Sequence, residues 1–170
     1  SDFVRHKNLE KKIKFSKNIE KFKNKKFDLI IINHVIEHVP DPLNFLFKLR
    51  SKLKPNGKII GQTPNYKDFT FNLFGDTWGA LHQPYHLNLF SKKSLKKLCS
   101  ESSFNIKISQ AFMPTGISMS LENLIKKFFN IKMKGRLKFY PFLLLGSFFI
   151  NLFVRIFNNQ GSIVNFEIYN

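Results

Sequence analysis

The first glycine in this chain of 170 residues is Gly57. Glycine-rich turns let the backbone approach a bound cofactor closely, so residues 1–56 contain no cofactor loop of that kind. The chain has a single cysteine, Cys99. One cysteine excludes an internal disulfide and fits a reducing compartment such as the cytoplasm. Cys99 falls in the apolar stripe of a predicted helix, where we expect a core residue rather than a nucleophile.

Acidic residues are also few: 11 Asp and Glu stand against 28 Lys and Arg, a formal net charge of +17. Such an excess is typical of proteins that bind nucleic acid or anionic membranes. Lys, Asn, Ile and Phe are all abundant, however, and AT-rich codons produce this composition in proteins of any function. No nucleic-acid-binding motif accompanies the dispersed lysines, so nucleic acid is not the expected partner. The length suits one domain, and no pattern indicates an oligomeric state.

Residues 27–65 predict a strand, a polar turn, a helix, a tight turn and a second strand. Residues 29–32 form an apolar run without alternation, as expected for a parallel strand covered on both faces. Asp41 and Pro42 are suited to begin the helix, and residues 58–62 form the second strand. Ligands of open α/β sheets bind beyond the carboxyl ends of the strands. The polar residues after the first strand therefore mark the expected site: Asn33, His34, Glu37 and His38.

The same stretch contains FDLI (27–30), EHVPD (37–41) and LKPNGKI (53–59), followed by TPN (63–65), WG (78–79) and PYHLNLFS (84–91). In this order and spacing the motifs closely resemble the second half of class I S-adenosylmethionine-dependent methyltransferases, in the type 11/type 23-like branch. The resemblance implies a Rossmann-like, doubly wound α/β fold. Its sheet would be mostly parallel, with an antiparallel carboxyl-terminal edge strand and the amino-terminal strands missing.

That family begins with a strand, a G-x-G-x-G turn, a helix and a second strand that ends in an acidic residue. The G-x-G-x-G turn is absent before Gly57, the first glycine of the chain, so residues 1–170 are interpreted as one incomplete methyltransferase domain, the carboxyl-terminal part of a larger one. The resemblance implies S-adenosylmethionine as the cofactor of the intact form. The chain alone is expected to bind this cofactor poorly and to be inactive.

Four residues are the predicted cofactor contacts. Residues 13–15 predict a short strand, and in the family the following turn contacts adenine through an Asp and an apolar residue, positions that Asn18 and Ile19 occupy here. An Asn can still accept a hydrogen bond from the adenine amino group, but it contributes no charge. Asn33 and His34 are predicted to contact the cofactor from the carboxyl end of the next strand.

Methyl transfer to a hydroxyl requires removal of a proton, and histidine is the natural base near neutral pH. His38 and His86 are the predicted catalytic residues, although each could instead hold a loop in place through hydrogen bonds. A metal site at His34, Glu37 and His38 is a weaker alternative. Residues 34–38 match the H-x-x-E-H pattern of one class of zinc peptidase, and some quinone-pathway methyltransferases bind a divalent ion through E-x-x-E-H at this turn.

Residues 63–90 form a long connection rich in aromatic side chains, which predict walls for an acceptor pocket or a seal over the core. The pocket would suit a small or lipid-linked acceptor such as a sugar or a quinol, methylated on oxygen. The predicted wall residues are Tyr66, Phe69, Phe71, Phe74, Trp78 and Tyr85.

Residues 116–158 predict a helical insertion between strands at 104–111 and 162–169, which would pair as a reversed hairpin at the sheet edge. Residues 139–157 contain one charged residue, Arg155, and six basic residues lie between 126 and 138. This pattern favours a peripheral membrane contact through residues 126–157. The alternative function is a basic module without catalysis that binds anionic membrane or nucleic acid.

Overall fold

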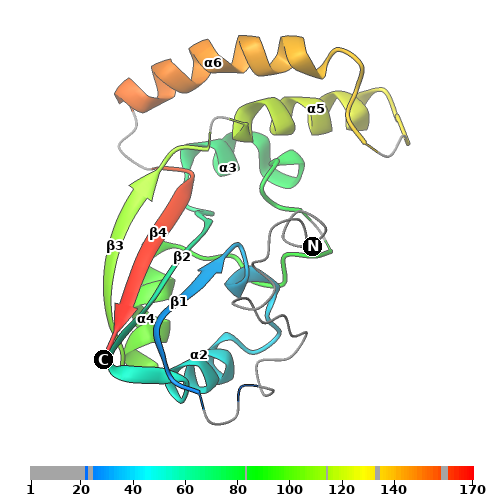
Figure 1. Cartoon of the computed structure of the whole chain (residues 1–170). Coiled ribbons are helices and arrows are strands. Elements are labelled where there is room, and N and C mark those ends of the chain that lie inside the picture. The colour runs from blue at the N-terminus through cyan, green and yellow to red at the C-terminus, as the bar shows by residue number, and fades with distance from the viewer. Residues whose placement is uncertain (1–21, 23–24, 83, 114, 133–134, 158–160) are drawn as a thin grey trace, which may run out of the picture.

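The computed structural model describes residues 22, 25–82, 84–113, 115–132, 135–157 and 161–170. Its sheet has four strands in the order β1-β2-β4-β3, namely β1 (Phe27–Asn33), β2 (Leu53–Pro64), β4 (Ile163–Tyr169) and β3 (Asn105–Ala111) (Figure 1). β1 and β2 are parallel, and β4 is antiparallel to both of its neighbours. Three of the four strands thus point the same way, which confirms the α/β fold class.

The position of the antiparallel strand differs from the prediction. β4 lies inside the sheet between β2 and β3, and the edge strand is β3. The reason lies in the side chains: Val164, Phe166 and Ile168 of β4 are buried against the core, whereas β3 (NIKISQA) alternates between exposed and half-buried residues. An edge strand tolerates such polar character, while an internal strand gains more from burial.

β1 pairs with β2 in continuous register over most of the length of β1, from Leu29 opposite Lys58 to Asn33 opposite Gln62. The predicted turn at residues 55–57 lies instead within β2, where the register shifts between Phe27 and Leu29. A Cβ atom on Gly57 would lie 2.7 Å from the backbone oxygen of Phe27, so glycine permits this close approach.

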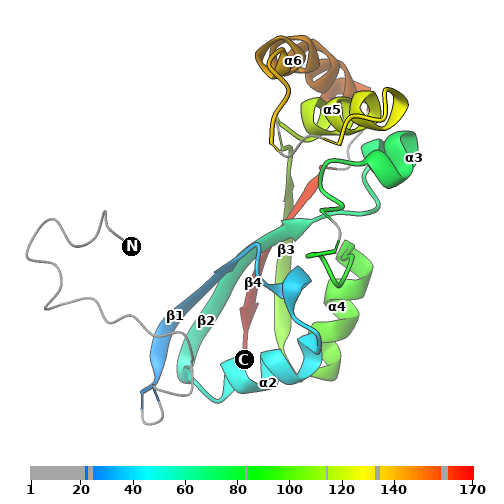
Figure 2. The same ribbon diagram turned by 90° about the vertical axis from the view of Figure 1, so that its right-hand side faces the viewer.

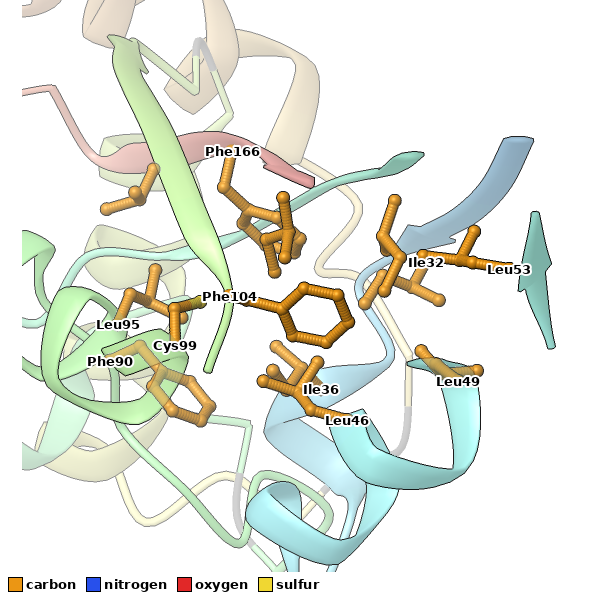
Figure 3. Packing of buried hydrophobic residues seen from close by; sticks show 13 residues of the cluster. Ile32, Ile36, Leu46, Leu49, Leu53, Phe90, Leu95, Cys99, Phe104 and Phe166 are labelled. Carbon is orange, nitrogen blue, oxygen red and sulfur yellow. The ribbon is translucent and has the colours of Figure 1, made fainter. Parts of the chain in front are cut away.

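Two helices cover one face of the sheet (Figure 2). α2 (Pro42–Arg50) begins at Asp41, whose side chain accepts a hydrogen bond from the backbone N–H of Asn44, as predicted. α4 (Lys92–Glu101) begins at Ser91 with a reciprocal capping box. The residues buried between these helices and the sheet form the core (Figure 3), and they include Ile32, Ile36, Leu46, Leu49, Leu53, Ile59, Phe90, Leu95, Cys99, Phe104, Val164, Phe166 and Ile168.

Cys99 is fully buried, which confirms the predicted core position. Burial raises the pKa of its thiol to about 12, so the thiol is not a nucleophile at neutral pH.

The opposite face of β1 is open among the described residues. Leu29 and Ile31 are 43% and 58% exposed, so the expectation of a strand covered on both faces is wrong for this part of the chain. The physical reason is that α2 and α4 both lie on the same side of the sheet (Figure 2). The strand expected at residues 13–15 lies outside the described residues.

The remaining helices lie at the carboxyl ends of β1, β2 and β3 (Figure 1). They are η3 (Ile36–His38), α3 (Phe69–Phe74), η4 (Gly75–Thr77), α5 (Gly116–Phe128) and α6 (Tyr140–Phe157). The insertion predicted at 116–158 is therefore two helices, which pack on each other and are separated at Asn130 and Gly135, both at positive φ. No helix in the described ranges combines the length and the apolar character that a membrane crossing requires.

Candidate functional site

The turn after β1 buries a carboxylate at the carboxyl ends of the two parallel strands. His34 adopts a left-handed backbone conformation, with φ of 50°, and the chain then enters η3. Glu37 is only 1% exposed. Its Oε1 lies 3.1 Å from His34 Nδ1, and its Oε2 accepts a hydrogen bond of 3.1 Å from the hydroxyl of Thr63 in β2. The carboxylate therefore joins the ends of β1 and β2.

Backbone hydrogen bonds attach the distant segment 85–88 to this turn. The backbone oxygen of Glu37 accepts from the N–H groups of Leu87 (2.8 Å) and Asn88 (3.0 Å). The side chain of Asn88 donates to the backbone oxygen of Val39 at 2.7 Å. These three bonds hold the two histidine-bearing loops together.

His38 and His86 meet at this junction. Nδ1 of His38 lies 2.8 Å from the backbone oxygen of Tyr85, and Nδ1 of His86 lies 2.8 Å from the backbone oxygen of Ala80. A carbonyl oxygen only accepts, so Nδ1 is the donor in both rings and Nε2 carries the lone pair when the ring is neutral. The ring centroids are 4.7 Å apart in an edge-on arrangement.

Several groups set the protonation of His86. Burial lowers its pKa below the ordinary value, and the neighbouring rings of His38 and His82 act in the same direction. The hydrogen bond to Ala80 and the charge of Glu37 oppose this without reversing it. His86 is therefore neutral at pH 7, which is the form that can accept a proton or bind a metal ion.

The structure brings together most of the residues singled out in the sequence. His38 and His86, 48 positions apart, are in contact, and His34 reaches the same cluster through Glu37. Asn33 is exposed at the end of β1, where it lines a depression on the sheet with Gln62 and Asn165. Asn18 and Ile19 lie outside the described residues.

Sequence reasoning missed two members of this site. Thr63 is one of them, and its place at the end of β2, next to the parallel strand that leads to Glu37, is a signal that could have indicated the contact. The other, Asn88, is part of the PYHLNLFS string. No local signal shows that its side chain reaches Val39.

Three of these residues could hold a metal ion. Glu37, His38 and His86 can each offer one ligand atom, and these atoms lie within 4.8 Å of one another. A carboxylate with two imidazoles suits divalent transition metals. The weaker alternative named His34 in place of His86, but His34 is not part of this group. The peptidase pattern requires both histidines on one face of an α-helix, whereas η3 is a 3-10 helix of three residues.

The aromatic residues of segment 66–85 divide into two sets. Trp78 is buried, donates through Nε1 to the hydroxyl of Thr70 at 3.0 Å, and packs edge-on against Phe71 at 5.3 Å. Phe69 and Tyr85 are exposed. One set thus seals the interior, and the other is accessible to a ligand.

An α/β sheet with polar side chains gathered at its carboxyl edge is typical of cofactor-dependent enzymes. A family model described as "Methyltransferase domain" matches residues 2–107. The chain therefore belongs to the methyltransferase domain family.

Curated relatives match over short stretches. The chain is 40% identical over 55 residues to a ubiquinone biosynthesis O-methyltransferase of Cereibacter sphaeroides, covering 31% of this chain and 22% of that protein. It is 46% identical over 37 residues to the mitochondrial ubiquinone biosynthesis O-methyltransferase of Schizosaccharomyces pombe, covering 22% of this chain and 14% of that protein. These matches span less than a quarter of each relative's length.

Solved structures share the fold at low identity. The [4+2]-cyclase SpnF matches with a TM-score of 0.58 at 14% identity, over 98% of this chain and 59% of that one. A methyltransferase of Thermotoga maritima, described as S-adenosylmethionine-dependent, matches with a TM-score of 0.52 at 14% identity, over 85% of this chain and 56% of that one. These likenesses establish the fold, and a fold alone does not specify a reaction.

Proposed function

We propose that the intact enzyme transfers a methyl group from S-adenosylmethionine to an oxygen atom of a small or lipid-linked acceptor, such as a sugar or a quinol. The observation that carries the proposal is the contact between His38 and His86 above the buried Glu37, at the carboxyl edge of a methyltransferase-family sheet. The similarity to ubiquinone biosynthesis O-methyltransferases supports oxygen as the acceptor atom.

The cofactor supplies a sulfonium-bound methyl group. The new bond joins this methyl carbon to the acceptor oxygen, the sulfur–methyl bond breaks, and the sulfur is left as a neutral thioether. The hydroxyl proton passes to Nε2 of His86, which is neutral because burial lowers its pKa. His38 is the second proposed catalytic residue, positioned by its hydrogen bond to Tyr85.

We assign the cofactor contacts to Asn33 and His34, together with Asn18 and Ile19. Asn33 fits this role because its side chain is exposed at the carboxyl end of β1. His34 fits because its ring is half-buried there and contacts Glu37 through Nδ1. The chain contains no glycine-rich loop before Gly57. We therefore expect the chain by itself to bind the cofactor weakly and to be inactive.

Calorimetric titration with S-adenosylmethionine tests the proposal. It is performed on this chain and on the longest polypeptide that its gene encodes. Saturable binding by the longer polypeptide is the expected result, and no binding by either would refute the cofactor assignment. With labelled cofactor and a panel of catechols, prenylated catechols and sugars, His86→Asn should lower kcat at least 100-fold while leaving cofactor affinity unchanged.

His82→Asn is the matched control for the proposed base. The His82 ring lies 5.3 Å from that of His86 but is exposed, so its replacement should change kcat less than about threefold. Equal losses in the two variants would show that His86 only supports the loop.

A divalent cation is a second proposal, supported by the ligand atoms of Glu37, His38 and His86. In this arrangement the ion would polarise the acceptor hydroxyl, and the neutral His86 ring would serve as a ligand rather than as a base. Calorimetric titration with Zn²⁺ and Mn²⁺ should show one site that His86→Ala removes and His82→Ala retains. An unchanged isotherm in His86→Ala would exclude the site.

The rival function is a basic module without catalysis. Its support is the net charge of +17. It predicts no saturable cofactor binding, together with DNA or vesicle binding that falls steeply with salt.

A further inference from the structure

Between residues 140 and 150, helix α6 exposes most of its apolar side chains and turns Tyr140 and Ser147 inward. Between residues 140 and 150 only Tyr140, Leu143 and Ser147 are buried or half-buried. The exposed side chains include Phe142 (76%), Leu145 (65%), Phe148, Phe149 and Ile150. This pattern reverses the usual amphipathic arrangement of a surface helix.

The inward face of α6 is held to α5 by small and polar groups. The hydroxyl of Tyr140 lies 3.1 Å from the hydroxyl of Ser118 in α5, and Ser147 is fully buried. Burying one large apolar side chain contributes about 1.5–3 kcal/mol. Among the described side chains of α6, most of the apolar surface is therefore on the outer face, where it gains hydrophobic free energy only against a partner.

The charge around this face indicates the partner. From residue 123 to residue 166 the sequence contains seven Lys and Arg and no Asp or Glu. Arg136 is paired with Glu122 at 2.7 Å. Lys132 and Lys138, just before α6, are exposed and form no ion pair with the described residues. An apolar face flanked by unpaired cations fits an anionic lipid surface.

A second copy of the chain fits less well, because it would bring the exposed Lys132 and Lys138 of the two copies toward each other. α6 is the outermost element at this end of the molecule in both views (Figures 1 and 2). With 18 residues it is about 27 Å long. Because α6 packs along α5 and the chain then returns to β4, the helix suits a position flat on a surface.

We propose that α6 lies in the interface of an anionic bilayer, with the Phe142–Phe149 side inserted and with Lys132 and Lys138 at the lipid headgroups. This docking does not depend on methyl transfer. The effect of docking on access to the acceptor, in contrast, rests on the proposed function. α5 holds the aromatic segment, since Ser120 accepts from the N–H of Gly79 at 2.8 Å and Asn123 donates to the backbone oxygen of Thr77 at 3.2 Å. Docking would bring this acceptor-side segment close to lipid-linked acceptors.

Flotation with vesicles tests the docking. The chain should bind vesicles of phosphatidylglycerol and phosphatidylcholine, bind pure phosphatidylcholine at least tenfold more weakly, and lose affinity as the ionic strength approaches about 0.5 M. The double variant Lys132→Gln/Lys138→Gln should weaken binding roughly 30-fold, at about 1 kcal/mol for each charge. The matched control, Lys93→Gln/Lys96→Gln on exposed positions of α4, should change binding less than threefold.

Phe142→Ser/Phe149→Ser should abolish flotation while leaving the circular dichroism spectrum unchanged, because both side chains are exposed. Failure of the wild-type chain to bind phosphatidylglycerol vesicles overturns the proposal. An equal loss of vesicle binding in the two double lysine variants also overturns the proposal. A dimer in vesicle-free solution that the double Phe variant dissociates would assign the face to a second copy instead. Saturable cofactor binding without flotation would refute the docking and leave the proposed function standing.

Discussion

Truncation of Glu37 to Ala should destabilise the chain by about 3 kcal/mol. The change leaves the buried Thr63 hydroxyl without its acceptor, at roughly 1–3 kcal/mol. It also removes a buried methylene group, at about 0.8 kcal/mol. The pair with His34 adds no more than about 1 kcal/mol, because that ring is 35% exposed.

Glu37→Gln separates charge from packing. The amide preserves the shape and one acceptor oxygen, so the expected loss is only about 1 kcal/mol. In combination with Thr63→Val, the double-mutant cycle should give a coupling of about 1 kcal/mol, since the two side chains share one hydrogen bond.

Urea unfolding followed by circular dichroism measures these differences. At about 2–4 °C per kcal/mol for a chain of this size, the melting temperature of Glu37→Ala should fall by about 10 °C. The control is Glu101→Ala, because this side chain is half-exposed and 3.7 Å from Lys97; the expected change is below about 0.5 kcal/mol. Equal effects in the two Ala variants would refute the view that Glu37 holds the strand ends together.

Three further outcomes follow from individual contacts. Asp68 is buried, one of its carboxyl oxygens has no hydrogen-bond partner in the described part of the chain, and burial raises its pKa although Thr70 opposes the shift. Wild-type stability should therefore fall as the pH rises from the ordinary Asp pKa through the raised one, and Asp68→Asn should remove this dependence in urea titrations across that range. A steeper dependence in the variant would contradict the burial argument. Cys99, with a pKa of about 12, should resist iodoacetamide in the native chain and react on unfolding in urea, whereas rapid native labelling would place it at the surface. Ser91→Ala should lower the free energy of unfolding by about 1 kcal/mol through loss of the cap, with Ser100→Ala as the exposed helical control, and equal values would show that the cap contributes nothing.

Local elements were predictable because their signals are local. Asp41 and Ser91 begin helices through side-chain bonds to residues three positions away, so a short sequence window contains the whole cause. The alternation in residues 104–111 and 162–169 similarly identified β3 and β4 as strands. Strand order could not be predicted this way, because the position of β4 depends on its pairing with both β2 and β3, which are distant in the sequence.

Most members of the site were predictable, but Thr63, Asn88 and the geometry of the site were not. The positions of His38, after the predicted strand at residues 29–32, and of His86, in the long connection at residues 63–90, both indicated the carboxyl edge of the sheet. The replacement of His34 by His86 in the potential metal group came from the fold, since the bonds between Glu37 and residues 87 and 88 bring the second loop in. The exposure of Phe142 and its neighbours was equally hidden, because the sequence shows that a helix is apolar but not which side of it faces the protein.

The missing early glycines and the motifs of residues 27–91 determined the family and predicted which part of it this chain represents. Composition and short-range spacing suffice for that, because they record turns, caps and strand ends that form between near neighbours. The tertiary structure alone decided that Glu37 is buried, that two distant imidazoles touch above it, and that α6 presents its apolar side outward. Those features depend on residues far apart in the chain, whose contacts exist only once the sheet has assembled.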